Sequence, residues 1–217
     1  MLKRFGISFA AICLSLGWAA IAYAAPIDIL VGDKDNYGGI PGCSDTGTCI
    51  WPGLGPSGSG YDGRSAAEAA SLIGAQITDS YSTLFPGFGP SLTQTADVIF
   101  SFTGTLTSAT LTIAMGDFQC STFGATLASI NGTATSFCFN DGFQATTIRS
   151  FVLTAAELAA ANLAHQVVLH LDHNNNADFI AFDWFELTAN ATVPEPSTLA
   201  LLGLALVGLG FVRRKSS

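Results

Sequence analysis

Basic side chains are scarce in this chain of 217 residues, and most of them lie at its two ends. The chain has 8 lysine and arginine residues, but only Lys34, Arg64 and Arg149 lie between residues 25 and 193. The same stretch holds 15 aspartate and glutamate residues, which gives it a formal net charge of −12. A surface this acidic repels phosphate backbones and anionic lipids. The charge therefore excludes nucleic-acid binding.

Motifs of the common enzyme classes are missing as well. The chain has no G-x-S-x-G elbow, no P-loop and no H-E-x-x-H pair. His165, His170 and His173 fall close together, but on a strand and its turn they are expected to be solvent-facing polar positions. The acidic residues could supply a glycosidase pair, yet a sequence does not show two carboxylates facing one cleft. We therefore expect a protein that is not an enzyme, with a glycan-processing enzyme as the alternative.

No apolar stretch reaches the roughly 20 residues that a membrane-spanning helix needs, but a shorter one lies near the N-terminus. It covers residues 5–21 and follows Lys3 and Arg4. The tripeptide Ala22-Tyr23-Ala24 then provides small residues on both sides of a cleavage position. This order predicts a signal peptide over residues 1–24.

A second short apolar stretch lies at the C-terminus, over residues 199–212, and is rich in glycine. As a helix it would cover about 21 Å, against roughly 30 Å of hydrocarbon in a bilayer. Arg213, Arg214 and Lys215 follow it and are expected to stay cytoplasmic as a basic stop. The stretch is therefore a short membrane helix that suits transient attachment, with the middle of the chain on the other side of the membrane.

The residues directly before this helix are Val193-Pro194-Glu195-Pro196-Ser197. Pro-Glu-Pro, a short apolar helix and a terminal basic cluster, in this order, resemble a PEP-CTERM sorting signal. The resemblance implies export by a bacterium that makes exopolysaccharide, and recognition of Pro194, Glu195 and Pro196 by a membrane exosortase. Delivery to the cell surface or extracellular matrix would follow. The ordinary alternative is a C-terminal anchor with a proline-rich stalk.

The chain is thus divided into a signal peptide (1–24), an exported domain (25–192) and a sorting signal (193–217).

The exported domain has the pattern of an all-β protein. From residue 97 onward, short segments alternate apolar and polar side chains, and Asn131-Gly132 is a strong hairpin-turn signal. Two matches to the S/T-x-x-E capping box, which begin at Ser65 and Thr154, predict one or two short helices. The pattern indicates an antiparallel two-sheet sandwich, for which we expect a jelly roll. The last strand, in "FIAFDWFEL", resembles that of secreted carbohydrate-binding jelly rolls. An immunoglobulin-like sandwich is the alternative.

Cysteine usage agrees with export. Cys13 lies in the signal peptide, and Cys43, Cys49, Cys120 and Cys138 remain, which allows three pairings. We favour disulfides between Cys43 and Cys49 and between Cys120 and Cys138, because each pair sits within one loop or hairpin. A four-cysteine zinc site is the rival interpretation, although short C-x-x-C spacings are missing.

Two acidic turns have side chains suited to calcium. Asp33 and Asp35 follow the expected first strand, and a jelly roll that brings its first and last strands together would place them near Asp183. The second turn has oxygen-bearing side chains at alternate positions: Asp172, Asn174, Asn176 and Asp178. It differs from a helix-flanked calcium loop because Ala177 replaces the usual glycine. Aspartate and asparagine are also common turn formers without any metal.

The sequence thus predicts a surface or biofilm-matrix protein that associates with exopolysaccharide. Trp51, Tyr61 and Tyr81 are candidate ligand-binding residues, because sugar rings stack on exposed flat aromatic rings. If these rings are buried, a purely structural matrix or adhesion component becomes the stronger hypothesis. The expected partners are the exosortase, polysaccharide and, transiently, the membrane.

Overall fold

The computed structural model of the chain describes residues 23–52, 60–85 and 94–193. Residues 24–192 form one compact unit, which corresponds to the expected exported domain. The expected membrane helix lies outside the described residues, and so does the expected signal peptide apart from Tyr23 and Ala24. Within the described part of the chain, no helix is long and apolar enough to span a membrane.

Eight long strands form two antiparallel sheets, as the sequence predicts. Strands β1 (Tyr23–Gly32), β11 (Ile180–Val193), β6 (Thr105–Gly116) and β9 (Ala145–Val152) are neighbours in this order in the first sheet. The second sheet has the order β5 (Thr95–Ser101), β10 (Gln166–Asp172), β7 (Thr126–Ile130) and β8 (Thr133–Phe137). Numbered along the chain, the long strands read 1-8-3-6 and 2-7-4-5. This is the strand order of a jelly roll, so the expected fold is confirmed.

The core lies between the two sheets. Alternating apolar residues of β5, β6 and β10 face inward, because the side chains of a strand point to its two faces in turn. In β10, Val167, Leu169 and Leu171 are fully buried while the residues between them are partly exposed. Strand β11 supplies the large side chains of Phe182 and Phe185 to the same core.

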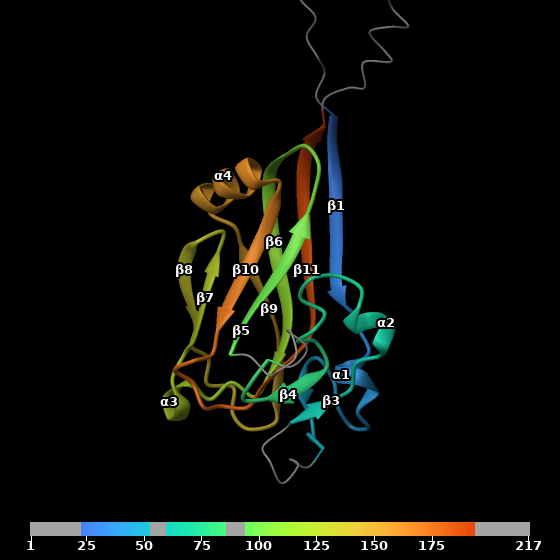
Figure 1. The fold of residues 1–217 in the computed structure, drawn as a ribbon, viewed down its shortest axis with the longest axis vertical. Coiled ribbons are helices and arrows are strands. Elements are labelled where there is room, and N and C mark those ends of the chain that lie inside the picture. The colour runs from blue at the N-terminus through green and yellow to red at the C-terminus, as the bar shows by residue number, and fades with distance from the viewer. Residues whose placement is uncertain (1–22, 53–59, 86–93, 194–217) are drawn as a thin grey trace, which may run out of the picture. The chain divides into compact units, whose positions relative to one another are not determined.

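The connection between β1 and β5 forms a layer at one end of the sandwich (Figure 1). We call residues 33–52 and 60–85 the loop layer. It contains α1 (Asn36–Gly39), β2 (Gly47–Thr48), β3 (Tyr61–Asp62), α2 (Ala66–Ala69) and β4 (Ser80–Ser82). Strand β2 pairs with β9 and β4 pairs with β11, so these short strands extend the first sheet. The loop layer has its own small core around Tyr37, Trp51 and Tyr81.

The helices are short. Of the two predicted capping boxes, the one at α4 is complete and the one at α2 is half formed. Helix α4 (Ala155–Ala164) begins with a complete capping box between Thr154 and Glu157. At α2 the Ser65 side chain accepts a hydrogen bond from the Glu68 amide, but Glu68 instead accepts one from the Thr78 hydroxyl. Helix α3 (Cys120–Phe123) follows β6.

Both favoured disulfides are formed. One joins Cys43 to Cys49 within the loop layer, and the other joins Cys120 in α3 to Cys138 just after β8. A four-cysteine zinc site is therefore ruled out, since each thiol is used in a bridge.

Replacing Cys120 and Cys138 together with serine should lower the free energy of unfolding by about 3 kcal/mol or less. The bridge spans a sequence separation of 18, and closing a loop of this size removes about that much conformational entropy from the unfolded chain. Urea unfolding of both proteins measures the difference. Equal unfolding free energies would contradict the expected stabilising role of the bridge.

Candidate functional site

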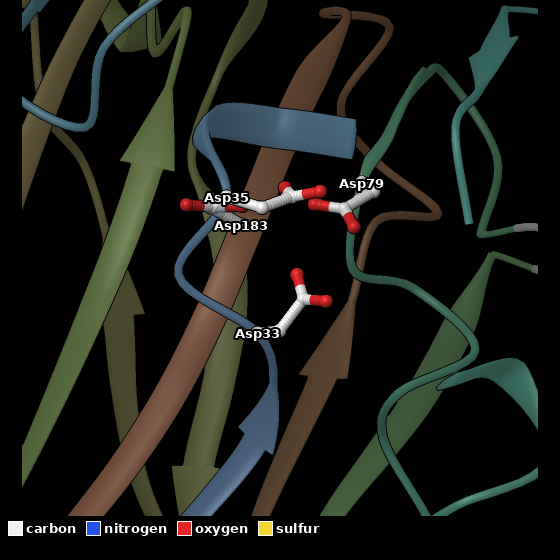
Figure 2. Close-up of side chains that lie close together, drawn as sticks. All are labelled: Asp33, Asp35, Asp79 and Asp183. Carbon is white, nitrogen blue, oxygen red and sulfur yellow. The ribbon is translucent and has the colours of Figure 1, made fainter. Parts of the chain in front are cut away.

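Four aspartates meet where the loop layer joins the first sheet. Asp33 and Asp35 follow β1, Asp79 directly precedes β4, and Asp183 belongs to β11. Figure 2 shows the carboxylates of Asp33, Asp35 and Asp79 around a common space, with Asp183 close to Asp35. One oxygen from each carboxylate can be chosen so that all four lie within 4.8 Å of one another. The predicted meeting of Asp33 and Asp35 with Asp183 is therefore present, and Asp79 is an additional member.

Close backbone contacts between β1, the loop layer and β11 hold this cluster. The Asp79 amide donates a hydrogen bond of 2.7 Å to the Phe182 carbonyl, and Thr78 forms a parallel bridge with Phe182. At Gly32 the backbone has a φ of +82°, and an added Cβ would lie 2.7 Å from the Asp183 carbonyl oxygen. Glycine is required there because the end of β1 touches the backbone of β11.

An irregularity in β11 sets the direction of Asp183. The pairing of β11 with β6 shifts register between Phe182 and Phe185, and both phenylalanines face the main core. In a regular strand, residues three apart would face opposite sides, so the bulge allows Asp183 to leave the core face. The Tyr37 amide then donates a 2.8 Å hydrogen bond to Asp183 Oδ1.

Three of the four oxygens of the inner carboxylates, Asp79 and Asp183, lack a hydrogen-bond donor among the described residues. The side chains of Asp79 and Asp183 are both 0 % exposed. Among the described residues, no donor reaches either oxygen of Asp79 or the Oδ2 of Asp183. Asp33 and Asp35 are exposed, and Asp35 Oδ1 accepts a hydrogen bond from the Gly38 amide at 2.7 Å. The cluster is therefore buried on one side and open to solvent on the other.

Burial raises the pKa of Asp79 and of Asp183 well above the usual range of a carboxyl group. Neighbouring carboxylates add to the shift: Asp183, Glu68 and Asp35 act on Asp79, and Asp45 acts on Asp183. The pKa of Asp33 is also raised, first by burial and then by Asp35. Without a cation the inner pair retains a proton, which we place on Asp79, because the Tyr37 amide donates to Asp183 and favours its charged form while Asp79 has no donor.

The exported domain supplies no cation of its own to this cluster. Its three lysine and arginine residues all lie in the described part of the chain, and each pairs with another acid. Lys34 contacts Glu186 at 2.6 Å, Arg64 contacts Asp62 at 2.6 Å, and Arg149 pairs with Asp141. No basic side chain of the domain forms an ion pair with the four carboxylates, although Arg64 acts on Asp79 over a longer distance.

The second acidic turn, residues 172–178, uses its side chains differently. Asp172 Oδ1 accepts hydrogen bonds from the backbone and side-chain nitrogens of Asn174. Asn176 is buried and donates to the Gly124 carbonyl, and Asp178 accepts from the Gln119 amide at 2.7 Å. These contacts are those of turn-forming and bridging residues, and each of the four side chains takes part in a hydrogen bond.

The candidate stacking aromatics are mostly buried. Trp51 is 8 % exposed and stacks on Tyr81, which is 4 % exposed and donates a hydrogen bond to Asp117. Tyr61 is half-buried against the same small core. Trp51 and Tyr81 therefore stabilise the loop layer and offer no face to a sugar ring.

The three histidines lie apart, and the solvent-facing interpretation was wrong for one of them. His170 is partly exposed and contacts Asp97 at 2.7 Å. His173 is fully buried, and its Nδ1 lies 3.0 Å from the Thr83 carbonyl, because its turn folds back onto the end of the loop layer.

A polar pocket of about 350 Å³ lies on the outer face of the first sheet. Strands β6 and β11 place Ser108 opposite Asn190 and Thr110 opposite Thr188, while the alternating Ala109 and Ala189 face the core. Strand β1 adds Pro26 and Asp28, both exposed. The lining thus presents hydroxyl and amide groups with one carboxylate. Sequence reasoning missed this pocket because it forms only where three strands distant in the chain lie together.

The described domain is thus an acidic jelly roll whose last strand ends where the sorting segment begins. The family of the PEP-CTERM protein-sorting motif matches residues 192–215. The chain carries a PEP-CTERM protein-sorting motif, which indicates export across the inner membrane and C-terminal processing for surface or extracellular placement. The motif implies processing by a membrane enzyme of the exosortase type. No curated protein matched the chain.

Three solved structures share a distant likeness. Latent PorU from Porphyromonas gingivalis is 14% identical with a TM-score of 0.40, and the match covers 81% of this chain and 14% of that one. The Podospora anserina GH26-CBM35 β-(1,4)-mannanase is 18% identical, with a TM-score of 0.34 and coverages of 78% and 29%. CBM35 from Cellvibrio japonicus Abf62 is 13% identical, with a TM-score of 0.33 and coverages of 77% and 99%. The jelly-roll assignment rests on the strand order rather than on these matches.

Proposed function

We propose that the exported domain is a non-catalytic component of the cell surface or extracellular matrix that associates with exopolysaccharide. The observation that carries the proposal is the sorting motif at residues 192–215, which directly follows the last strand of the domain. Because the motif directs C-terminal processing, the jelly roll is the part of the chain that remains to act outside the cell.

The outer-face pocket is the place where a polysaccharide would bind. Its hydroxyl and amide groups can exchange hydrogen bonds with the hydroxyl groups of a neutral sugar. Asn190 Nδ2 already donates to Ser108 Oγ at 3.0 Å, which orders the two side chains. A neutral glycan is also the chemistry that a domain with a net charge of −12 tolerates.

The pockets support a binding protein rather than an enzyme. An apolar pocket, also of about 350 Å³, is lined by Ile27, Ile29 and Phe102 with two hydroxyl residues. Asp28 is the single acidic residue among the linings of these two pockets, so neither holds a facing carboxylate pair. A purely structural matrix or adhesion role is the second candidate, and the burial of Trp51 and Tyr81 favours it.

Replacing Thr188 and Asn190 with alanine should weaken the binding of residues 25–192 to the host's purified exopolysaccharide about 30-fold in a co-sedimentation assay. The reason is the loss of about two hydrogen bonds to sugar, each contributing about 1 kcal/mol. Thr112→Ala is the matched control, because Thr112 lies on the same sheet and contacts Ser150 outside the pocket.

Equal sedimentation of the pocket variant and the control would contradict binding at this pocket. If the unchanged domain does not sediment with the polysaccharide at any concentration, the structural candidate replaces the proposal. Neither result bears on the sorting signal, which is tested separately by the processing of a Pro194, Glu195 and Pro196 variant.

A further inference from the structure

We propose that Asp33, Asp35, Asp79 and Asp183 bind one Ca²⁺ ion, which fastens the loop layer to the end of β1 and to β11. This inference concerns a metal site and does not depend on polysaccharide binding. It rests on the buried, unpartnered carboxylates at the centre of the cluster as well as on the cluster itself.

The inner carboxylates require a positive partner. Asp79 and Asp183 are 0 % exposed, and three of their four oxygens have no donor among the described residues. A buried ionised carboxylate without a partner is strongly unfavourable, and buried charges are therefore paired or bind metals. All three basic side chains of the domain are paired with other acids. When both carboxylates are ionised, their positive partner comes from solution, on the side where Asp33 and Asp35 are exposed.

The spacing of the ligands fits calcium. Ca²⁺ binds six to eight oxygens at about 2.3–2.6 Å, so two ligands on opposite sides of the ion are about 4.6–5.2 Å apart. The four carboxylate oxygens lie within 4.8 Å of one another, which agrees with one such coordination sphere. Mg²⁺ binds at about 2.0–2.1 Å and prefers to keep several waters, so it suits a site with four carboxylates less well.

The position of the ligands defines what the ion does. Asp33 and Asp35 belong to the start of the loop layer, Asp79 to its end, and Asp183 to the sandwich. The chain between Asp35 and Asp79 contains Tyr37, Trp51 and the Cys43–Cys49 bridge, so the ion closes this segment at both of its ends. Calcium binding should thus slow opening of the loop layer more than opening of the sandwich.

A proton shared by Asp79 and Asp183 is the competing explanation for the inner pair. The two explanations differ in how calcium acts and in how the isosteric change Asp79→Asn behaves. The amide removes one negative charge and can donate to Asp183. A site that only shares a proton would gain nothing from calcium. In chelator the Asp79→Asn domain should be more stable under either explanation, because the amide removes the cost of protonating a buried carboxyl group. Only a calcium site would lose part of its response to calcium.

The test uses residues 25–192, which correspond to the compact unit with its own core and both disulfides. Calorimetric titration with CaCl₂ should show one ion per chain. At 100 times its dissociation constant, calcium should raise the melting temperature by roughly 5–10 °C over the value in chelator. Hydrogen exchange in residues 33–48 and 60–82 should slow on adding calcium, while exchange in β7 and β8 changes little.

Three variants distinguish calcium binding at the four aspartates from a general effect of the negative charge of the domain. Asp79→Asn should melt higher than the unchanged domain in chelator and lose at least tenfold in calcium affinity. Asp33→Asn tests an exposed ligand, so a folding defect is not expected, and it should also weaken calcium binding. Asp28→Asn is the control, because it removes one exposed charge from β1 outside the cluster.

Several outcomes would overturn the proposal. One is an unchanged melting temperature with calcium and with chelator. Another is a calcium affinity that Asp33→Asn leaves intact, or that Asp28→Asn lowers equally. A response to Mg²⁺ as large as that to Ca²⁺ would contradict the assignment of the ion.

Discussion

Replacing Pro194, Glu195 and Pro196 with alanine will leave the precursor uncut and in the membrane fraction of its native host. These residues form the core of the matched sorting motif, and they lie directly before the apolar stretch over residues 199–212. If the exosortase reads this tripeptide, its removal abolishes processing rather than slowing it slightly. Immunoblotting of cell fractions and intact-mass measurement of the protein show whether the C-terminal segment is still attached.

A matched control changes the same tail without touching the motif. Ser216 and Ser217 lie beyond the matched residues, so their replacement with alanine should leave processing and delivery normal. Normal product size and normal delivery of the triple-alanine variant would show that the tripeptide is not the processing signal.

The sandwich could be predicted from the sequence because its strands alternate regularly. Alternation fixes which face of a strand is buried, and turn residues fix where strands end. Asn131 and Gly132 both have positive φ in the tight turn between β7 and β8, as this dipeptide predicts. The order of strands within each sheet depends on contacts between distant parts of the chain, and only the general architecture was accessible without the structure.

The acidic cluster was only partly predictable. Asp33, Asp35 and Asp183 were accessible because a jelly roll brings its first and last strands together. Asp79 was missed, because its place depends on the hydrogen bond of its amide to Phe182 and on a φ of 49°, neither of which has a sequence pattern. A non-glycine residue in this conformation is uncommon and often marks a special site.

Whether the loop aromatics are exposed or buried could not be decided from the sequence. Trp51 and Tyr81 lie in segments rich in glycine and proline, which have no periodicity from which to infer an inner face. The structure packs them against Tyr37 and Phe179 in a small core separate from the sandwich. Segments of this kind are exposed or buried according to their partners, and these partners are distant in the chain.

Gly32→Ala should lower the free energy of unfolding in chelator by about 2–4 kcal/mol, equivalent to a fall of roughly 5–15 °C in melting temperature. Two effects add at this position. The φ of +82° is strained for alanine, and the new Cβ would lie 2.6 Å from Thr78 Cγ2 and 2.7 Å from the Asp183 carbonyl oxygen. Because the carbonyl belongs to β11, relief requires the end of β1 to move away from the cluster.

Gly132→Ala separates the two effects. Gly132 has nearly the same φ, +80°, but an added Cβ would meet nothing within 4 Å. Its replacement should therefore cost only the conformational strain, about 1–2 kcal/mol. Urea unfolding of the two variants side by side measures the difference, which is the part due to close contact between β1 and β11. If Gly32→Ala is no more destabilising than Gly132→Ala, the end of β1 is free to move, and the close backbone contact does not hold Asp33 beside Asp183.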